Sequence, residues 1–331
     1  MIILRAIALG ILQGLTEFIP ISSSAHLVIV PWLFQWNDPA LESLAFDVAL
    51  HLGTLVALLW FFAADWVRLI RAGVQSILSL RAVWAKQSPN RESGIPFDSA
   101  QGMASSHPST RFARSGSLLA MTPERSRDDV DRRLAWLLVI GCIPGGIVGV
   151  LAESKVEELF HPAHAPIQPA AMIAMSVIIA LLGAALFAAE RLARHLRKLN
   201  EVSLRDAILI GLAQSFAIFP GVSRSGSTIT AGLALGLERE AAARFSFLLS
   251  APIIAGAGAK SVLNIFSAIE AGALTQQELV LFPIGFLAAA ISGYLCIKFL
   301  LRFLQRNSTD IFVYYRWVLA ALIVVVALVR G

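Results

Sequence analysis

The sequence is poor in charge and nearly free of cysteine. Charged side chains make up 15% of its 331 residues, whereas a soluble domain carries about 25%. Cys142 and Cys296 both lie in apolar runs and form no CxxC motif, which excludes a disulfide framework and a cysteine metal site. A cleavable signal peptide is not expected either, because the first apolar run reaches Glu17 without a small-residue cleavage site.

Long hydrophobic runs are abundant instead. Hydrophobic residues make up 57% of the chain, and the mean hydropathy is +0.72. Runs of this length and apolarity predict an all-α polytopic membrane protein with six transmembrane helices. The net charge of +5 is then interpreted through its distribution along the loops, and no nucleic-acid partner is expected. The predicted spans are residues 46–64, 134–152, 170–189, 243–263, 280–301 and 312–329.

Two polar stretches interrupt this apolar chain at corresponding places. Residues 13–26 read QGLTEFIPISSSAH and residues 214–228 read QSFAIFPGVSRSGST; an offset of 201 aligns Gln13 with Gln214 and Ser22 with Ser223. Prolines stop a helix before each serine cluster, and a serine can cap the next helix. We therefore predict two re-entrant helix–loop–helix pairs in an inverted repeat. Two ordinary surface helices are the alternative for the first pair.

Loop charge predicts the topology and the division of the chain. If basic loops face the cytoplasm, six spans leave both termini outside. The chain is then one integral membrane domain, residues 1–331, built from two half-repeats of opposite orientation. Residues 81–133 are rich in Ser, Pro and charge, which predicts a disordered cytoplasmic loop insertion. The first half-repeat comprises residues 1–80 and 134–190, and the second comprises residues 202–331.

The polar residues of the two breaks suit phosphate chemistry. Gln13 and Glu17 share a helical face, and a carboxylate at membrane depth indicates function. Serines and His26 follow Glu17, while Arg224 and more hydroxyls lie in the second break. A lipid-phosphate hydrolase and a transporter both fit this set, and Ser/Thr helix packing with an Arg–Glu pair is a third interpretation. The acid-phosphatase signature SR-x5-H is excluded because no histidine follows Arg224.

Both stretches resemble known motifs. Residues 13–26 are similar to an (E/Q)-x3-E motif with a P-x-S-S-x-x-H continuation, and residues 220–228 are similar to PGxSRSxxT. Together they resemble the undecaprenyl-diphosphate phosphatase family of the bacitracin-resistance type, over the whole chain except residues 81–133. The resemblance implies an enzyme of the bacterial plasma membrane that converts undecaprenyl diphosphate to undecaprenyl phosphate and phosphate. Its active site would face the periplasm, and its activity would recycle the carrier lipid for cell-wall synthesis and confer bacitracin resistance.

The resemblance also implies roles, a cofactor and partners. Glu17 is the key carboxylate, as base or metal ligand, and Gln13 stands where many members have Glu. Ser23 or His26 is the nucleophile or its activator, and the favoured assignment is Ser23 with His26 and Glu17 activating it; Arg224 clamps phosphate. The expected cofactor is a divalent cation, Mg²⁺ or Ca²⁺, and the expected partners are a polyprenyl diphosphate, membrane lipids and a second copy in a homodimer. The residues expected to bind the substrate phosphate are Ser22, Ser24, Ser223, Ser225 and Thr228.

Overall fold

The regular structure is helical in the computed structural model, which describes residues 1–87, 126–160, 169–219, 221–270 and 275–330. The one extended pairing within these ranges is a single bridge between Arg197 and Leu237. The helices are α1 Ile2–Phe18, α2 Ser23–Phe34, α3 Leu44–Phe61, α4 Ala63–Gln87, α5 Arg127–Phe160, α6 Pro169–Leu192, α7 Leu204–Ser215, α8 Arg224–Ala234, α9 Arg239–Glu270, α10 Gln276–Leu304 and α11 Asp310–Arg330, with short 3₁₀ turns at Leu199–Glu201 and Phe216–Ile218.

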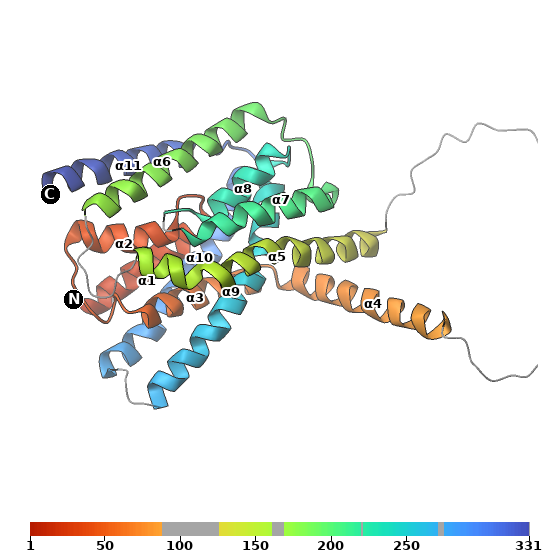
Figure 1. Cartoon of the computed structure of the whole chain (residues 1–331), viewed down its shortest axis with the longest axis horizontal. Helices are drawn as coiled ribbons and strands as arrows, with labels where there is room; N and C mark the ends of the chain where they lie inside the picture. The colour runs from red at the N-terminus through yellow and green to blue at the C-terminus, as the bar shows by residue number, and fades with distance from the viewer. Residues whose placement is uncertain (88–125, 161–168, 220, 271–274, 331) are drawn as a thin grey trace, which may run out of the picture.

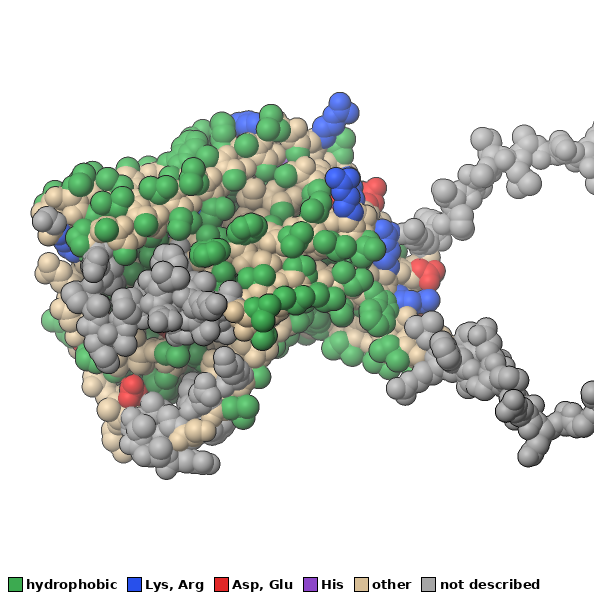
Figure 2. Space-filling model, viewed as in Figure 1, with side chains coloured by type: hydrophobic (Ala, Val, Ile, Leu, Met, Phe, Trp, Pro, Cys, Tyr) green, Lys and Arg blue, Asp and Glu red, His purple; other side chains and the backbone are tan. Residues whose placement is uncertain are grey.

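Six of these helices are long and apolar enough to cross a membrane: α3, α5, α6, α9, α10 and α11. Each corresponds to one of the six predicted spans, although α3 ends at Phe61, three residues before the predicted end of the first span. Hydrophobic side chains dominate the visible face of the bundle (Figure 2), as expected where lipid replaces water around a protein. The all-α, six-span membrane fold predicted from the sequence is therefore confirmed.

The two broken helix pairs each pack against a span from the other part of the chain. α1 lies against α10, and α7 lies against α5, while α6 and α11 run side by side (Figure 1). α1 and α10 can approach closely because Gly10 has no side chain. A Cβ added at Gly10 would lie only 2.6 Å from the carbonyl oxygen of Gly285. The re-entrant character of the short pairs and the boundaries of the half-repeats stay predictions.

The helices on either side of the predicted insertion are longer than the sequence indicates. α4 continues to Gln87 and α5 begins at Arg127, so the non-helical interval predicted for residues 81–133 narrows at both ends. α4 is amphipathic: its buried Leu69 belongs to the main core, and Arg68 pairs with Asp131 of α5, Nε to Oδ2 at 3.3 Å. A helix stabilised in this way needs no long apolar run. Residues 88–125 lie outside the described residues.

Figure 2 shows basic and acidic side chains at the end of the bundle that lies away from both chain termini in Figure 1. There Glu190 of α6 accepts hydrogen bonds from Arg239 Nε at 2.8 Å and from the Thr309 hydroxyl at 2.8 Å. Arg197 pairs with Asp206 at the start of α7. Burial alone would raise the pKa of Asp206, but hydrogen bonds from Arg197 and Ser203 outweigh it and hold that pKa below its ordinary value.

Candidate active site

Two helix breaks with serine caps form the framework of the site. After α1 ends, Ser22 has a φ of 78°, and its Oγ accepts a hydrogen bond from the Ala25 N–H at 3.4 Å. In the second break, Gly221 has a φ of 90°, which favours glycine. Ser223 Oγ then accepts from the Gly226 N–H at 3.0 Å. Serines at equivalent positions of the two stretches thus cap α2 and α8, as the sequence predicts.

Glu17 is the centre where the two breaks meet. Its side chain is buried, and its Oε2 accepts hydrogen bonds from Ser23 Oγ at 2.6 Å and from Gln13 Nε2 at 3.1 Å. Its Oε1 forms an ion pair with the guanidinium of Arg224. A carboxylate and a hydroxyl from the first break therefore contact an arginine from the second, although the two lie about 200 positions apart in the sequence.

The remaining predicted hydroxyls differ in which parts of the chain they connect. Ser225 Oγ donates to the Ile19 carbonyl at 3.2 Å, which ties the second break to the first. Thr228 donates to the Arg224 carbonyl at 2.8 Å and bonds to Ser246 of α9 at 2.5 Å, so it joins α8 to α9. Ser24 is exposed, and Ser22 Oγ lies 3.4 Å from its hydroxyl. Ser24 and Thr228 thus lie outside the polar contacts of Glu17.

His26 is buried, and both of its ring nitrogens are engaged. Nδ1 lies 2.6 Å from the Ser22 carbonyl oxygen, and Nε2 lies 2.7 Å from the Tyr315 hydroxyl. A carbonyl only accepts, so Nδ1 carries a proton and donates to it, while Nε2 shares a hydrogen bond with the tyrosine hydroxyl. The ring also stacks on Tyr315 with a centroid distance of 5.7 Å. His26 therefore anchors the first break to α11 and leaves no ring nitrogen for Ser23.

Two residues approach the breaks without having been predicted there. His51 of α3 has Nε2 at 3.9 Å from Glu17 Oε2, and its Nδ1 donates to the Asp47 carbonyl at 2.8 Å. Arg316 of α11 is 1% exposed, and its Nε donates to the Pro20 carbonyl at 2.6 Å. An ionisable residue inside an apolar span is the signal that could have identified both.

The donor set around Glu17 suits a hard cation. Gln13 Oε1 is buried and has no hydrogen-bond partner among the described residues, so it is a free oxygen acceptor beside a carboxylate. Mg²⁺ and Ca²⁺ take oxygen ligands, and Mg²⁺ commonly uses one or two carboxylates together with substrate phosphates. Across the described ranges no three His, Cys, Asp or Glu side chains cluster as metal ligands. Gln13 Oε1 and the Glu17 carboxylate therefore offer two oxygen ligands of the kind that such a cation takes.

Comparison with known proteins identifies the family. A family model described as "Bacitracin resistance protein BacA" matches residues 6–93 and 109–322. The chain belongs to this family. The BacA match includes both breaks and every residue of the Glu17 cluster, and its one internal gap, residues 94–108, lies outside the described residues.

Individual relatives align along nearly the whole chain. A protein of Thermomicrobium roseum is 41% identical over 97% of both chains, and one of Moorella thermoacetica is 40% identical over the full length of both. A protein of Methanobrevibacter smithii is 41% identical over 97% of this chain and 96% of its own. Each of these relatives is named undecaprenyl-diphosphatase. The resemblance of the two serine motifs to this family is thus confirmed.

Proposed function

We propose that this BacA-family chain hydrolyses undecaprenyl diphosphate to undecaprenyl phosphate and inorganic phosphate. The observation that carries the proposal is the contact of Glu17 with both Ser23 and Arg224 at the meeting of the two breaks. A base, a hydroxyl nucleophile and an arginine in one cluster supply the groups that phosphoryl transfer requires. The names of the full-length relatives support the same substrate.

In the proposed reaction, Ser23 Oγ attacks the terminal phosphorus of the diphosphate. Its proton passes to Glu17 Oε2, which already accepts that hydroxyl at 2.6 Å. The bond from the terminal phosphorus to the bridging oxygen breaks, and undecaprenyl phosphate leaves with the electron pair. Water then hydrolyses the phosphoserine, which releases inorganic phosphate and restores Ser23. Glu17 returns the first proton to the leaving undecaprenyl phosphate, then takes a proton from the attacking water and passes it to Ser23 Oγ, so each turnover consumes one water molecule and restores both side chains.

In this proposal Arg224 binds the substrate phosphate, and the helix N-termini behind the capping serines orient that phosphate. The planar guanidinium of Arg224 offers paired N–H donors that match two phosphate oxygens. In the absence of substrate these donors face Glu17, so an incoming phosphate exchanges one anionic partner for another. The N-termini of α2 and α8 follow the capping serines, and the free N–H groups of a helix N-terminus favour an anion. Ser22, Ser24, Ser223, Ser225 and Thr228 remain the hydroxyls that we expect around the phosphates.

The base assigned here is Glu17, because both nitrogens of His26 are engaged by Ser22 and Tyr315. We propose that His26 holds the first break in place, so that Ser23 keeps its position beside Glu17. We further propose that Glu17 and the free Oε1 of Gln13 hold the divalent cation, Mg²⁺ or Ca²⁺. When bound, such a cation neutralises charge on the diphosphate.

The same proposal includes a location. Basic residues at the end of the bundle away from the termini favour the cytoplasm for that end. We further propose that the chain lies in the plasma membrane with its site open to the periplasm. Hydrolysis would recycle the carrier lipid for cell-wall synthesis and would confer bacitracin resistance by removing the diphosphate that bacitracin sequesters. The homodimer stays a prediction.

Phosphate release by the purified chain in detergent tests the proposal. We expect release from a prenyl diphosphate, and we expect a chelator to suppress it and Mg²⁺ or Ca²⁺ to restore it. A transporter predicts no release, because a detergent micelle offers no second side of a membrane. Absence of phosphate release from a folded sample that still binds the prenyl diphosphate would therefore overturn the hydrolase and favour transport.

A further inference from the structure

Two basic side chains lie without a partner on the outer face of α10. Lys298 and Arg302 are one turn apart and exposed, and neither forms an ion pair or a side-chain hydrogen bond within the described part of the chain. Arg239 and Arg244, at the same end of the bundle, each pair with a carboxylate. The positive charges of Lys298 and Arg302 thus remain available to an external anion.

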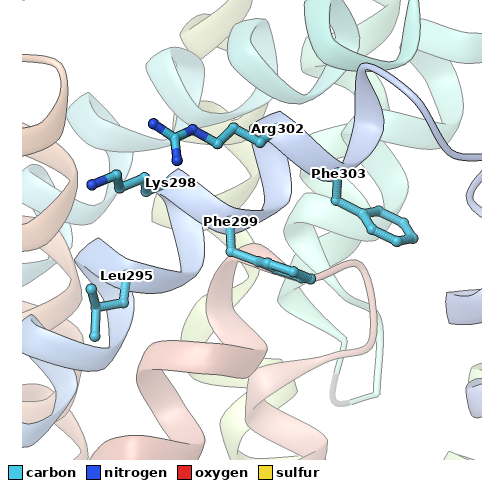
Figure 3. A pocket seen from close by; sticks show the side chains of 5 residues that line it. All are labelled: Leu295, Lys298, Phe299, Arg302 and Phe303. Atoms are coloured by element: carbon cyan, nitrogen blue, oxygen red, sulfur yellow. The ribbon is translucent and has the colours of Figure 1, made fainter.

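Aromatic and aliphatic side chains share this face with the two cations (Figure 3). Leu295, Lys298, Phe299, Arg302 and Phe303 line a shallow groove of about 400 Å³. The rings of Phe299 and Phe303 stack with a centroid distance of 5.7 Å, and Leu295 and Phe299 are each more than half exposed. In Figure 3 the two basic side chains extend toward the same side of the helix. The groove therefore combines an apolar floor with a pair of cations.

The part of this α10 face that lies deeper than the two cations is apolar. α10 ends at Leu304, so Lys298 lies six residues, about 9 Å, before the end of the helix. A lysine at that depth extends its ammonium toward the headgroups while its stem stays in the apolar layer. Leu295 lies deeper, and the exposed Ile291 continues the apolar face. An acyl chain would therefore contact Ile291 and Leu295 in the apolar layer, while a headgroup phosphate would lie nearer the end of the helix, beside the two cations.

We propose that this groove, which we name the α10 groove, binds an anionic phospholipid of the surrounding leaflet. The headgroup phosphate would lie between Lys298 and Arg302, and an acyl chain would lie along Leu295 and Phe299. Two unpaired cations complement a lipid with net negative charge, whereas a zwitterionic headgroup carries its own cation. The proposal is independent of the phosphatase reaction and needs no residue of the Glu17 cluster.

The position of the α10 groove favours a phospholipid over the prenyl substrate. The opposite face of α10 is buried against α1: Ser292 Oγ lies 3.4 Å from the Gly10 carbonyl, and Cys296 Sγ lies 3.3 Å from the Leu15 carbonyl. The helix itself therefore separates the groove from the Glu17 cluster. A lipid in the groove contacts the enzyme from the membrane side and does not enter the reaction site.

Native mass spectrometry of the full chain tests this site. The purified protein is mixed with equal amounts of dioleoyl phosphatidylglycerol and dioleoyl phosphatidylcholine, and lipid retention is measured as the activation energy rises. We expect preferential retention of phosphatidylglycerol, and an apparent affinity that falls at least about tenfold in Lys298→Gln/Arg302→Gln, because charge-assisted hydrogen bonds are lost. The matched control is Arg194→Gln/Arg205→Gln, which removes the same charge from exposed residues outside the groove and should retain the lipid.

Several outcomes would overturn the inference. Equal retention of both lipids would show that the groove does not select an anionic headgroup. Equal loss in the two double variants would reduce the effect to the overall charge of the protein. Preferential retention of a prenyl phosphate would make the groove a substrate or product site, and a dimer that the groove variant abolishes would make it an interface between copies. Phosphate release and thermal unfolding in detergent identify a variant that fails to fold; for such a variant, the single changes Lys298→Gln and Arg302→Gln repeat the comparison.

Discussion

Replacing Glu17 by glutamine isolates the charge at the centre of the site. The amide keeps the shape of the side chain, but it removes the base from Ser23 and the counterion from Arg224. Loss of a general base lowers the rate by about 10²–10⁴-fold. Loss of one partner of a buried ion pair also costs about 3–5 kcal/mol of stability. We therefore expect phosphate release to collapse and the unfolding temperature to fall.

A matched control separates these two effects. Glu190 is also a buried carboxylate paired with an arginine, Arg239, but it lies at the charged end of the bundle. Glu190→Gln should lower the unfolding temperature in the same way, while phosphate release per folded molecule stays near the wild-type value. The assay measures phosphate released from a prenyl diphosphate in detergent, divided by the folded fraction from size-exclusion chromatography. Added Mg²⁺ or Ca²⁺ should not rescue Glu17→Gln.

Two results would refute this reasoning. If Glu17→Gln releases phosphate within a few-fold of wild type per folded molecule, Glu17 is neither base nor essential metal ligand. If Glu190→Gln loses as much activity per folded molecule, the loss reflects general damage to the bundle and not chemistry at Glu17. A Glu17→Asp variant adds a gradation, because it keeps the charge and shortens the reach to Ser23, and we expect it to retain part of the activity.

Three further predictions follow from the same structure. Arg224→Lys should lower phosphate release by at least about tenfold, because an ammonium replaces a planar clamp with a point charge; near-normal release would leave Arg224 a packing role. Asp206 has a lowered pKa through Arg197, so its stabilisation is lost as pH falls through that pKa. Asp206→Asn should be less stable near neutral pH and show a flatter fall in unfolding temperature as the pH falls below about 5. Gly226→Ala should lower the unfolding temperature by overpacking worth about 1–3 kcal/mol, because the added Cβ meets the buried guanidinium of Arg316; an unchanged unfolding temperature would contradict this.

The six spans were predictable because each depends on one local property. An apolar run of about 20 residues has no other stable state in a bilayer, so its length and composition suffice. α4 was not predictable in this way. Charged and polar residues interrupt its apolar residues every few positions, and its stability depends on packing against α5 through Leu69 and the Arg68–Asp131 pair. Contacts of that kind depend on the tertiary arrangement of two segments, which no single stretch of sequence encodes.

The members of the site were more predictable than their contacts. Proline, glycine and serine caps act locally, so both breaks and their polar residues follow from the sequence. Which hydroxyl meets Glu17 depends on the unusual backbone of Ser22, whose φ of 78° lies outside the helical range. With this backbone, the Ser23 hydroxyl contacts the Glu17 carboxylate, and the His26 ring contacts the Tyr315 hydroxyl. His51 was missed because only the packing of α3 brings it to Glu17.

The two breaks are alike in sequence but complementary in chemistry. At the offset of 201 that aligns their serine caps, Ser23 corresponds to Arg224 and Glu17 corresponds to Ile218. Two carboxylates in the cluster would repel each other, as would two arginines, so a symmetric cluster would lose the Glu17–Arg224 pair. The two glutamines occupy equivalent positions but differ in their contacts. Gln13 donates to Glu17, whereas the buried amide of Gln214 has no hydrogen-bond partner within the described residues. Each half of the chain therefore supplies what the other lacks, and under the proposed reaction neither half alone holds both the base and the phosphate clamp.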